Sequence, residues 1–575
     1  MNTIKDRPWL KSYPEDIPKS LDYPNIPLYK MLEETTEKYP NNTATVFFDA
    51  KITYRELTRQ VHAFAHCLQE LGVKKGDRVA IMLPNSPQLV ISYYAALKIG
   101  AIVVQTNPLY KENELKHQMR DSESKVLISL NIIYPTIQKI RNKTQLEKVI
   151  LTSIKDYLAF PFNLLYPLKE KREGKNVKIP PQEDVLWFKQ LMNKYSGKEP
   201  KQVELDPKED LALIQYTGGT TGTSKGAMLT HSNLVANVTQ MKSWIPDLKE
   251  GEEMTMGALP FFHVYGMTAC MNYSISAGGT LILVPRFDVN NILKLIKKYR
   301  PTLFPGVPTM YIALLDHPDI KKYDISSIRV CLSGAAPLPV RVQKEFEEIT
   351  GGKLVEAYGL SETSPATHCN LIYGHREEGS IGIPLPDTDC KVVDLETGKE
   401  DLPIGERGEL AVKGPQVMKG YWNMPDETNM VLKDGWFYTG DIAIMKENGF
   451  FFIVDRKKDM ILAGGFNVYP RDVEEVLYKH PKISEACVIG VQDEYRGETV
   501  KAFIVPKKDE KLTEEEVEKY CKENLAAYKV PKIFEFADEL PKTLIGKVLK
   551  RTLREKEDDE DEEEEKEEAK KGKTG

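Results

Sequence analysis

Long apolar runs are missing from this sequence of 575 residues, and none approaches the ~18 residues that a membrane-spanning helix needs. The N-terminus also lacks the apolar core of a signal peptide, because charges and prolines stand in its place. With 41% hydrophobic and 29% charged residues, the composition is that of a globular protein. We therefore expect a cytoplasmic protein and, because single cores stop growing at roughly 250 to 300 residues, two or more domains.

Cysteines are few and scattered, and no CxxC pair occurs among them. Their number is odd and their spacing wide, which disfavours both a disulfide framework and a zinc ribbon. We expect each to be a small buried apolar group: Cys67, Cys270, Cys331, Cys369, Cys390, Cys487 and Cys521.

An excess of basic residues is absent as well. The chain carries 79 Lys and Arg against 85 Asp and Glu, a net charge of -6. Residues 555–575 hold twelve acidic and five basic side chains, so the rest of the chain is close to neutral. This balance gives no electrostatic footprint for nucleic acid, and the acidic tail, with almost nothing apolar to bury, is predicted to be disordered.

Short β-rich runs alternate with helical patterns through the first 380 residues, which indicates α/β layers around largely parallel sheets. Residues 53–72 have helical apolar spacing and end on Gly72, a C-cap candidate. Beyond residue 380, closely spaced strands with glycine turns indicate a more antiparallel subdomain. The last hundred residues restart as a small α+β domain that includes a capping box from Thr513 to Glu516. Strands are expected at 79–84, 101–106, 125–130, 211–217, 280–285 and 328–334.

Residues 156–175 concentrate Phe and Leu between prolines and then turn basic. Two interpretations stay open. The segment is either an ordinary packed insertion, or an apolar lip, centred on residues 157–168, beside a lipid entrance or a bilayer surface.

A loop made for phosphate follows the expected strand at 211–217. Glycines let backbone N–H groups approach a polyphosphate, hydroxyls add donors, and Lys225 adds a positive charge. The loop is not a Walker loop, because Lys225 follows Gly222 by three residues and precedes Gly226. A purely structural turn is the alternative. The other expected contacts are Gly218, Gly219, Thr217, Thr220, Thr221, Thr223 and Ser224.

Five more motifs follow, and together the six resemble those of the adenylate-forming superfamily, which includes acyl-CoA synthetases, luciferases and the adenylation domains of peptide synthetases. The resemblance covers nearly all of residues 25–556 and keeps the family's motif order. The five are LSGAAPL (332–338), EAYGLSET (356–363), YTGD (438–441), DRKKDMILAGGFNVYP (455–470) and PKTLIGK (541–547).

The resemblance implies a site for ATP and Mg²⁺. It places Tyr358 beside the adenine, Glu362 on Mg²⁺ and Thr363 near the α-phosphate, roles that suit a flat ring and a hard carboxylate oxygen. Asp441 would bind the ribose hydroxyls and Arg456 the ribose or a phosphate. The further expected contacts are Thr217 with the metal and Gly334, Ala335, Ala336, Glu356, Ala357 and Gly359 around the nucleotide.

The resemblance also implies that the small domain supplies Lys547, which would bridge the carboxylate and α-phosphate oxygens and stabilise charge during attack on phosphorus. His263 resembles a residue that lines the acyl-carboxylate and thiol-entry region, although packing between aromatic neighbours is an equal alternative. Gly464 and Gly465 would meet the pantetheine arm of coenzyme A after the domain rotates.

Four segments are therefore expected. Residues 1–454 form an adenylate-forming domain of layered α/β subdomains plus a distorted β-barrel-like subdomain, and residues 455–458 form a hinge, with Asp455 preferred over Lys458 as pivot. Residues 459–556 form a small mobile α+β domain, and 557–575 the acidic tail.

The sequence looks most like a bacterial long-chain fatty acid:CoA ligase, with fatty acid, ATP and coenzyme A as substrates. Further expectations are a homodimer and a peripheral contact with the inner face of the membrane. The main alternative is a ligase for a medium-chain or coumarate-like acid. A peptide-synthetase loading module is disfavoured because only the acidic tail follows residue 556. A non-catalytic nucleotide-binding protein is disfavoured because Glu362, Asp441 and Lys547 are intact. Luciferase-like light emission can be tested only by assay.

Overall fold

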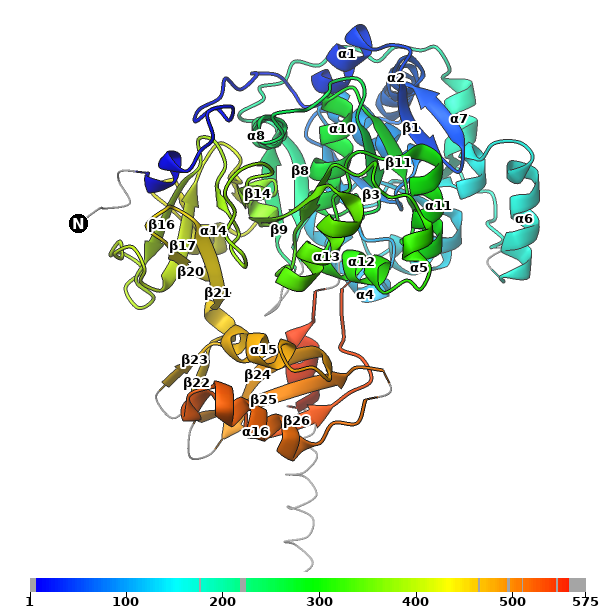
Figure 1. Ribbon diagram of the computed structural model, residues 1–575. Helices are drawn as coiled ribbons and strands as arrows, with labels where there is room; N and C mark the ends of the chain where they lie inside the picture. Colours follow the sequence, from blue (N-terminus) through cyan, green and yellow to red (C-terminus); the bar gives the residue numbers. More distant parts are fainter. Residues whose placement is uncertain are drawn as a thin grey trace, which may run out of the picture.

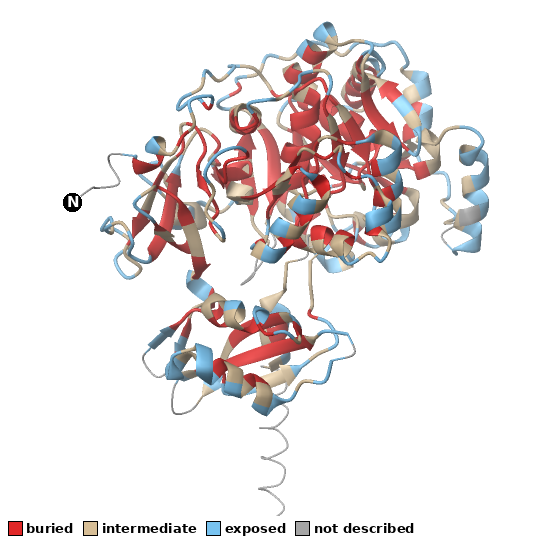
Figure 2. Cartoon of the chain, in the orientation of Figure 1, coloured by how far each residue is buried: buried red, intermediate tan, exposed pale blue. Residues whose placement is uncertain are grey.

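The computed structural model describes residues 7–174, 177–217, 224–463, 466–493, 497–508, 510–543 and 547–557. A large domain is followed, after strand β21 (Phe451–Arg456), by a small domain that faces one side of it (Figure 1). Buried strands form the interior of both (Figure 2). The predicted fold class, layered α/β followed by a small α+β domain, is confirmed.

An eight-stranded sheet forms the first half of the large domain, in the order β18-β9-β8-β4-β3-β5-β6-β7. The six strands from β8 to β7 are parallel, and helices flank them, which explains their near-continuous Val, Ile and Leu content. Predicted strands are confirmed as β3 (Arg78–Met82), β4 (Ile102–Gln105), β5 (Val126–Leu130) and β8 (Leu211–Tyr216). The other strands are β6 (Lys148–Thr152), β7 (Val185–Trp187), β9 (Gly226–Thr230) and β18 (Gly420–Tyr421), and the helices are α3 (Pro87–Lys98), α4 (Glu112–Asp121), α5 (Tyr134–Arg141), α6 (Phe162–Arg172), α7 (Phe188–Lys194) and α8 (His231–Ser243).

A second layered unit holds two four-stranded sheets, β10-β11-β1-β2 and β12-β13-β14-β15. Leu303 joins them through bridges to Thr255 and Val330. The predicted strands at 280–285 and 328–334 are confirmed as β11 (Thr280–Leu283) and β12 (Val330–Ser333). The other elements are β1 (Thr43–Phe47), β2 (Ala50–Thr53), β10 (Met254–Gly257), β13 (Lys353–Gly359), β14 (Ala366–Cys369), β15 (Ile383–Pro384), α9 (Val264–Gly266), a π-helix (Met267–Asn272), α10 (Tyr273–Ser276), α11 (Val289–Tyr299), α12 (Pro308–Leu315) and α13 (Val340–Thr350).

The antiparallel subdomain predicted beyond residue 380 is a five-stranded sheet, β16-β17-β20-β19 with β21 paired to β20. Asp441 on β20 lies opposite Arg456 on β21, so this pairing register fixes two expected site residues against each other. The bounds are β16 (Asp389–Val393), β17 (Gly408–Lys413), α14 (Pro425–Val431), β19 (Leu432–Lys433) and β20 (Trp436–Met445).

The small domain packs helices on a sheet of order β23-β22-β25-β24, with β26 parallel to β25. Half of the predicted capping box begins helix α16: the Thr513 hydroxyl accepts a hydrogen bond from the Glu516 N–H at 3.3 Å. Residues 558–575, most of the predicted tail, lie outside the described residues. The bounds are β22 (Ile461–Ala463), β23 (Phe466–Val468), α15 (Pro470–Tyr478), β24 (Ile483–Asp493), β25 (Gly497–Pro506), α16 (Glu514–Asn524) and β26 (Ile533–Phe536).

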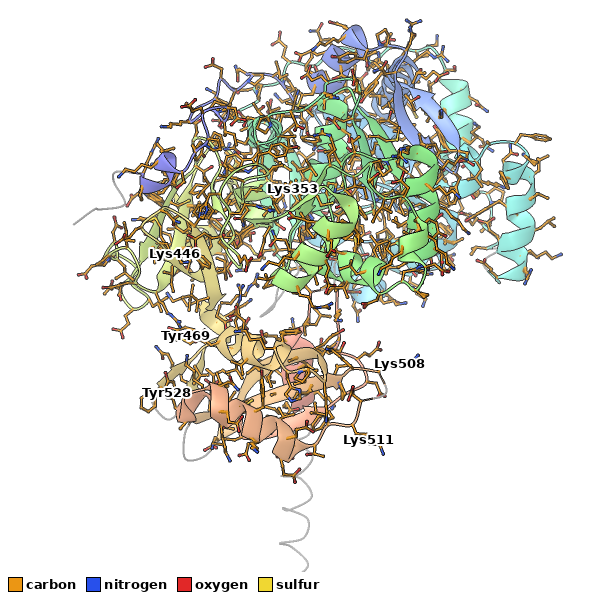
Figure 3. The ribbon with its side chains drawn as sticks, in the orientation of Figure 1. Lys353, Lys446, Tyr469, Lys508, Lys511 and Tyr528 are labelled. Atoms are coloured by element: carbon orange, nitrogen blue, oxygen red, sulfur yellow. The ribbon has the colours of Figure 1, made fainter. Side chains whose placement is uncertain are left out.

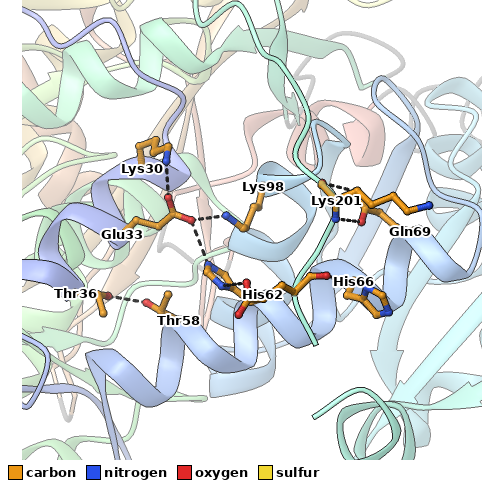
Figure 4. A network of polar contacts seen from close by, with 10 residues as sticks. Lys30, Glu33, Thr36, Thr58, His62, His66, Gln69, Lys98 and Lys201 are labelled. Atoms are coloured by element: carbon orange, nitrogen blue, oxygen red, sulfur yellow. Dashed lines mark hydrogen bonds and ion pairs between the residues drawn. The ribbon is translucent and has the colours of Figure 1, made fainter. Parts of the chain in front are cut away.

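A partly buried carboxylate joins the N-terminal helices. Glu33 of α1 (Tyr29–Lys38) accepts hydrogen bonds from Lys30 at 2.8 Å and His62 at 3.2 Å and pairs with Lys98 (Figure 4). Burial opposes ionisation, but these three donors outweigh it and hold the pKa of Glu33 well below its usual range. The predicted helix at 53–72 is confirmed as α2 (Tyr54–Glu70), which carries His62, so Glu33 joins α1, α2 and α3.

All seven cysteines are free and buried, as predicted. Within the described residues, no helix combines the length and apolarity that crossing a bilayer requires.

Candidate active site

Three of the sequence motifs lie at the end of β8, on β13 and on β20. A cavity of about 340 Å³ opens there. Its wall is polar and carries both signs of charge, which suits a charged ligand better than an apolar one. The residues of the wall used below are Glu362, Glu409, Tyr421, Lys433, Thr439, Gly440 and Lys457.

Three residues from three different motifs form one group, joined by a hydrogen bond and an ion pair. The Tyr358 hydroxyl donates to Asp441 Oδ2 at 2.5 Å, and Arg456 Nε lies 3.3 Å from Asp441 Oδ1. Burial, reinforced by the Asp441 charge, raises the pKa of Tyr358 well above its usual value, so the phenol stays a donor. The group presents a flat ring, a carboxylate and a guanidinium within one buried region.

Glu362 reaches the cavity from a short 3₁₀ turn, Ser361–Thr363. Its Oε1 accepts the Tyr421 hydroxyl at 2.8 Å, and burial raises the pKa of its carboxyl. Thr363 is fully buried, and its hydroxyl bonds to the Leu360 carbonyl at 3.1 Å and to the Pro365 carbonyl. Among the described residues, no group of three or more acidic, His or Cys side chains is placed to hold a metal, so a Mg²⁺ ion bound at Glu362 would need phosphate and water oxygens as its other ligands.

The segment expected to line the adenine is tightly packed. A Cβ on Gly359 would lie 1.9 Å from the Pro365 carbonyl oxygen, so that position admits no larger residue, whereas one on Gly334 would lie 3.1 Å from the Tyr265 ring, which would have to shift. Ala335 follows with a φ of 68°. Burial raises the pKa of the nearby Glu356 carboxyl to about 7.

The two ends of the phosphate loop, at Thr217 and at residues 224–225, are joined by hydrogen bonds. The Thr217 N–H donates to the Lys225 carbonyl at 2.9 Å, and the Ser224 hydroxyl donates to the Thr217 carbonyl at 2.7 Å. The residues predicted between them, Gly218, Gly219, Thr220, Thr221, Gly222 and Thr223, lie outside the described residues, as do Gly464 and Gly465.

Two residues at this site were not predicted from the sequence, Tyr421 and Glu427. Lys225 forms an ion pair with Glu427 of α14, and its ammonium lies 5.2 Å from the centre of the Tyr421 ring. Tyr421 thus contacts the lysine through its ring and Glu362 through its hydroxyl. Tyr421 lies on β18, which pairs with strand β9. Glu427 contacts Lys225 across 202 residues of sequence, and no local spacing predicts a contact of that kind.

Lys547, from the small domain, lies near the group of Tyr358, Asp441 and Arg456. Two hydrogen bonds join Lys547 to Thr543, one from the Thr543 N–H to the Lys547 carbonyl at 2.8 Å and one from the Lys547 N–H to the Thr543 hydroxyl at 3.1 Å. Burial and the charge of Arg456 lower the pKa of its amine to about 8. Burial and the charge of Lys547 in turn lower the pKa of His263 to about 4, so the histidine is neutral.

The expected hinge lies at the end of β21. Asp455 accepts hydrogen bonds from the Arg456 N–H at 2.7 Å and the Arg471 N–H at 2.8 Å. Burial raises the pKa of its carboxyl to about 6. Asp455 still pairs with Ile442 in the β20–β21 ladder, and the strand ends at Arg456, immediately before Lys457 and Lys458.

The chain is similar to known proteins along nearly its whole length. A family model described as "AMP-binding enzyme" matches residues 32–422, and its C-terminal domain matches 472–547. A long-chain-fatty-acid–CoA ligase from Bacillus subtilis is 52% identical over 96% of this chain and 98% of its own. Its counterpart from an Escherichia coli strain is 41% identical over 95% and 98%. The crystal structure of ATP-bound MatB from Rhodopseudomonas palustris superimposes with a TM-score of 0.81 at 32% identity, covering 92% of this chain and 99% of that chain.

The Lys225–Glu427 ion pair generates a prediction about nucleotide affinity. If the cavity binds a nucleoside triphosphate, Glu427 competes with the phosphates for Lys225. Glu427→Gln should then lower the KM for ATP by about 1.5- to 5-fold, the range for a partly exposed ion pair of ~0.2–1 kcal/mol. Steady-state kinetics at moderate salt measure the change.

Asp426→Asn is the matched control, because Asp426 is exposed in the same first turn of α14. An equal fall in KM for this variant would trace the effect to the general charge of the helix. A rise in KM for Glu427→Gln would show that Glu427 supports ATP binding instead of opposing it.

Proposed function

Since the chain belongs to the AMP-binding enzyme family, we propose that it is an AMP-forming long-chain fatty acid–CoA ligase. The fatty acid carboxylate attacks the α-phosphorus of ATP, giving acyl-AMP and pyrophosphate. The thiol of coenzyme A then attacks the acyl carbon, giving the thioester, AMP and a proton. The observation that carries the proposal is the group of Tyr358, Asp441 and Arg456, with Lys547 near enough for the Arg456 charge to lower its pKa, because this arrangement puts positive charge where anionic reactants must approach.

In the proposed nucleotide site, each motif contacts a different part of ATP. The adenine lies against Tyr358 and the backbone of residues 334–336, and the ribose hydroxyls bond to Asp441. Mg²⁺ would be held by Glu362 and Thr217 and would neutralise phosphate charge while the triphosphate lies on the loop at 217–225.

The proposed role of Lys547 is to stabilise charge in the first half-reaction. Its lowered pKa means that the ammonium survives in a buried site only below about pH 8, unless an anion joins it. The incoming carboxylate and α-phosphate are such anions. His263, held neutral and accepting the Tyr265 N–H at 3.3 Å, would border the reacting carboxylate without adding charge.

The second half-reaction, in this proposal, follows a rotation of the small domain at residues 455–458. The rotation withdraws Lys547 and brings Gly464 and Gly465 to the pantetheine arm of coenzyme A. The proposed location is the cytoplasm, and the further proposed partners are a second copy of the chain and the inner face of the membrane, contacted through residues 157–168.

Substrate preference is the direct test of this function. With ATP, Mg²⁺ and coenzyme A, saturated acids of roughly 12 to 18 carbons should exceed acetate and coumarate in kcat/KM by at least ~10-fold, since each buried methylene is worth about 0.8 kcal/mol. A pyrophosphate-release assay across acids of increasing length measures the preference. Coumarate turned over as well as palmitate would overturn the long-chain assignment and favour the coumarate-like alternative.

The pKa of Lys547 predicts a pH dependence. A lysine is charged below its pKa, so in the free enzyme the active ammonium is lost as the pH rises through about 8 instead of 10.5. The kcat/KM for ATP in acyl-AMP formation, which reports the free enzyme, should fall over that range. Lys547→Arg, which keeps the charge, should lose the fall, and Lys547→Ala should slow the step by ~10²-fold.

Conversion of pre-made acyl-AMP to thioester serves as the internal control, because the proposal withdraws Lys547 from that step. The same fall in both half-reactions above pH 8 would assign the titration to another group.

The hinge proposal predicts an effect on the second step. Asp455→Pro, which holds φ near -65°, should slow thioester formation from acyl-AMP more than it slows pyrophosphate release. Asp455→Asn keeps backbone freedom and one acceptor, so its two half-reactions should keep their normal ratio. If Asn impairs the second step as strongly as Pro does, the carboxylate contacts and not rotation at this residue would explain the defect.

A further inference from the structure

One surface of the large domain is unlike the rest. Residues 158–172, here called the apolar finger, include helix α6, which stands at the edge of the large domain away from the small domain (Figure 1). Most of the helix is exposed along its length (Figure 2). The sequence left two interpretations of this segment open, a packed insertion or an apolar lip, and the structure decides between them.

The finger exposes apolar side chains that a packed insertion would bury. Five large ones within nine residues are 54% to 77% exposed, whereas most others of this kind in the described chain stand singly or in pairs. Single exposed apolar residues are ordinary, but a contiguous group marks an interaction surface. The five are Phe160, Phe162, Leu164, Leu165 and Leu168.

The opposite side of the helix holds it on the body of the protein. Tyr166 packs against the main hydrophobic core, and Glu170, four residues later and on the same helix face, accepts the Ser153 hydroxyl at 3.5 Å. Burial raises the pKa of Glu170, as expected for a side chain turned inward. Leu164 and Leu168, also four residues apart, therefore point outward because the inward face is already occupied.

The charge next to these apolar groups is positive. Residues 168–178 contain five basic and two acidic side chains, and Glu170, one of the two acidic ones, is turned toward the body. Lys171 and Arg172 at the end of α6 are exposed. Apolar side chains beside basic ones fit the boundary between acyl chains and anionic headgroups.

We propose that the apolar finger docks the protein on an anionic phospholipid bilayer. The five apolar side chains enter the headgroup–acyl boundary, and Lys171 and Arg172 lie at the lipid phosphates. The proposal rests on the proposed function only in the sense that a bilayer is where long-chain fatty acids partition. Because the finger lies on the large domain, docking leaves the small domain free to rotate.

The test is co-sedimentation of the full chain with vesicles. Wild-type protein should bind phosphatidylcholine vesicles that contain phosphatidylglycerol, and bind pure phosphatidylcholine at least ~5-fold more weakly, since each basic residue near an anionic surface contributes. The variant Phe160→Ser/Phe162→Ser/Leu164→Ser/Leu165→Ser should lose most binding to both. These side chains are exposed, so the thermal unfolding midpoint should stay near that of the wild type.

A charge-reversed pair separates the electrostatic part. Lys171→Glu/Arg172→Glu should lower binding to the anionic vesicles to the level seen with pure phosphatidylcholine. The matched control is Lys508→Glu/Lys511→Glu, because both lysines are exposed on the small domain, away from α6 (Figure 3). The control should bind as the wild type does.

Three outcomes would overturn the inference. Equal binding of both vesicle types would show that anionic headgroups are not recognised. If the control pair lost as much binding as Lys171→Glu/Arg172→Glu, the effect would come from the general charge of the protein. Absent vesicle binding, with a dimer that the serine variant converts to monomer in sedimentation velocity, would assign the surface to a second copy of the chain. Vesicle binding is measured without substrates, so a failure of long-chain ligase activity would count against the proposed function and leave this result standing.

Discussion

Buried charge at the junction of the two domains is the constraint on which the rest of the structure depends. Lys547 and Arg456 are both cations, and burial lowers the lysine pKa to about 8. Asp441 is the buried anion that lies beside Arg456. Burial makes the Lys547 charge costly in an empty site, as its lowered pKa shows, and in the proposed mechanism the anionic reactants would offset that cost where the first bond forms.

The proposed rotation requires that this arrangement can form and also come apart. Asp455 bonds to backbone N–H groups on both sides of the junction, from Arg456 and from Arg471 of α15. Inside the small domain, Arg554 pairs with Asp459 at 2.9 Å and Lys550 with Glu474 at 2.9 Å. Both pairs lie within the small domain and would therefore move with it. A rotation would leave these two pairs intact and would break contacts that cross the junction, such as Arg407 with Asp472 at 3.3 Å and the Arg471 guanidinium with the Ile453 carbonyl at 2.6 Å.

Most of the fold was predictable from the sequence because its signals are local. The parallel strands appear as short apolar runs, and the motif residues around Tyr358, Asp441 and Lys547 were found because each motif is contiguous. Tyr421 and Glu427 were missed for a physical reason, since each acquires its role only from a partner far away in the chain, at Glu362 and Lys225. Composition likewise left the apolar finger undecided, because a Phe and Leu cluster has the same sequence whether it is packed or exposed.

The small domain has an exposed apolar surface of its own, which the proposed rotation between two positions would explain. Phe466 and Tyr528 stack with ring centres 4.9 Å apart, yet they are 57% and 39% exposed, and Leu462 on the adjoining strand is 53% exposed. Tyr528 lies on the outer side of the domain, away from the large domain (Figure 3). A domain with a single position would gain stability by covering such a pair. Phe466 directly follows Gly464 and Gly465, so a rotation that brings those glycines to coenzyme A must carry the stacked pair toward the large domain as well. The exposed rings are therefore part of the surface that the proposed rotation would bring against the large domain.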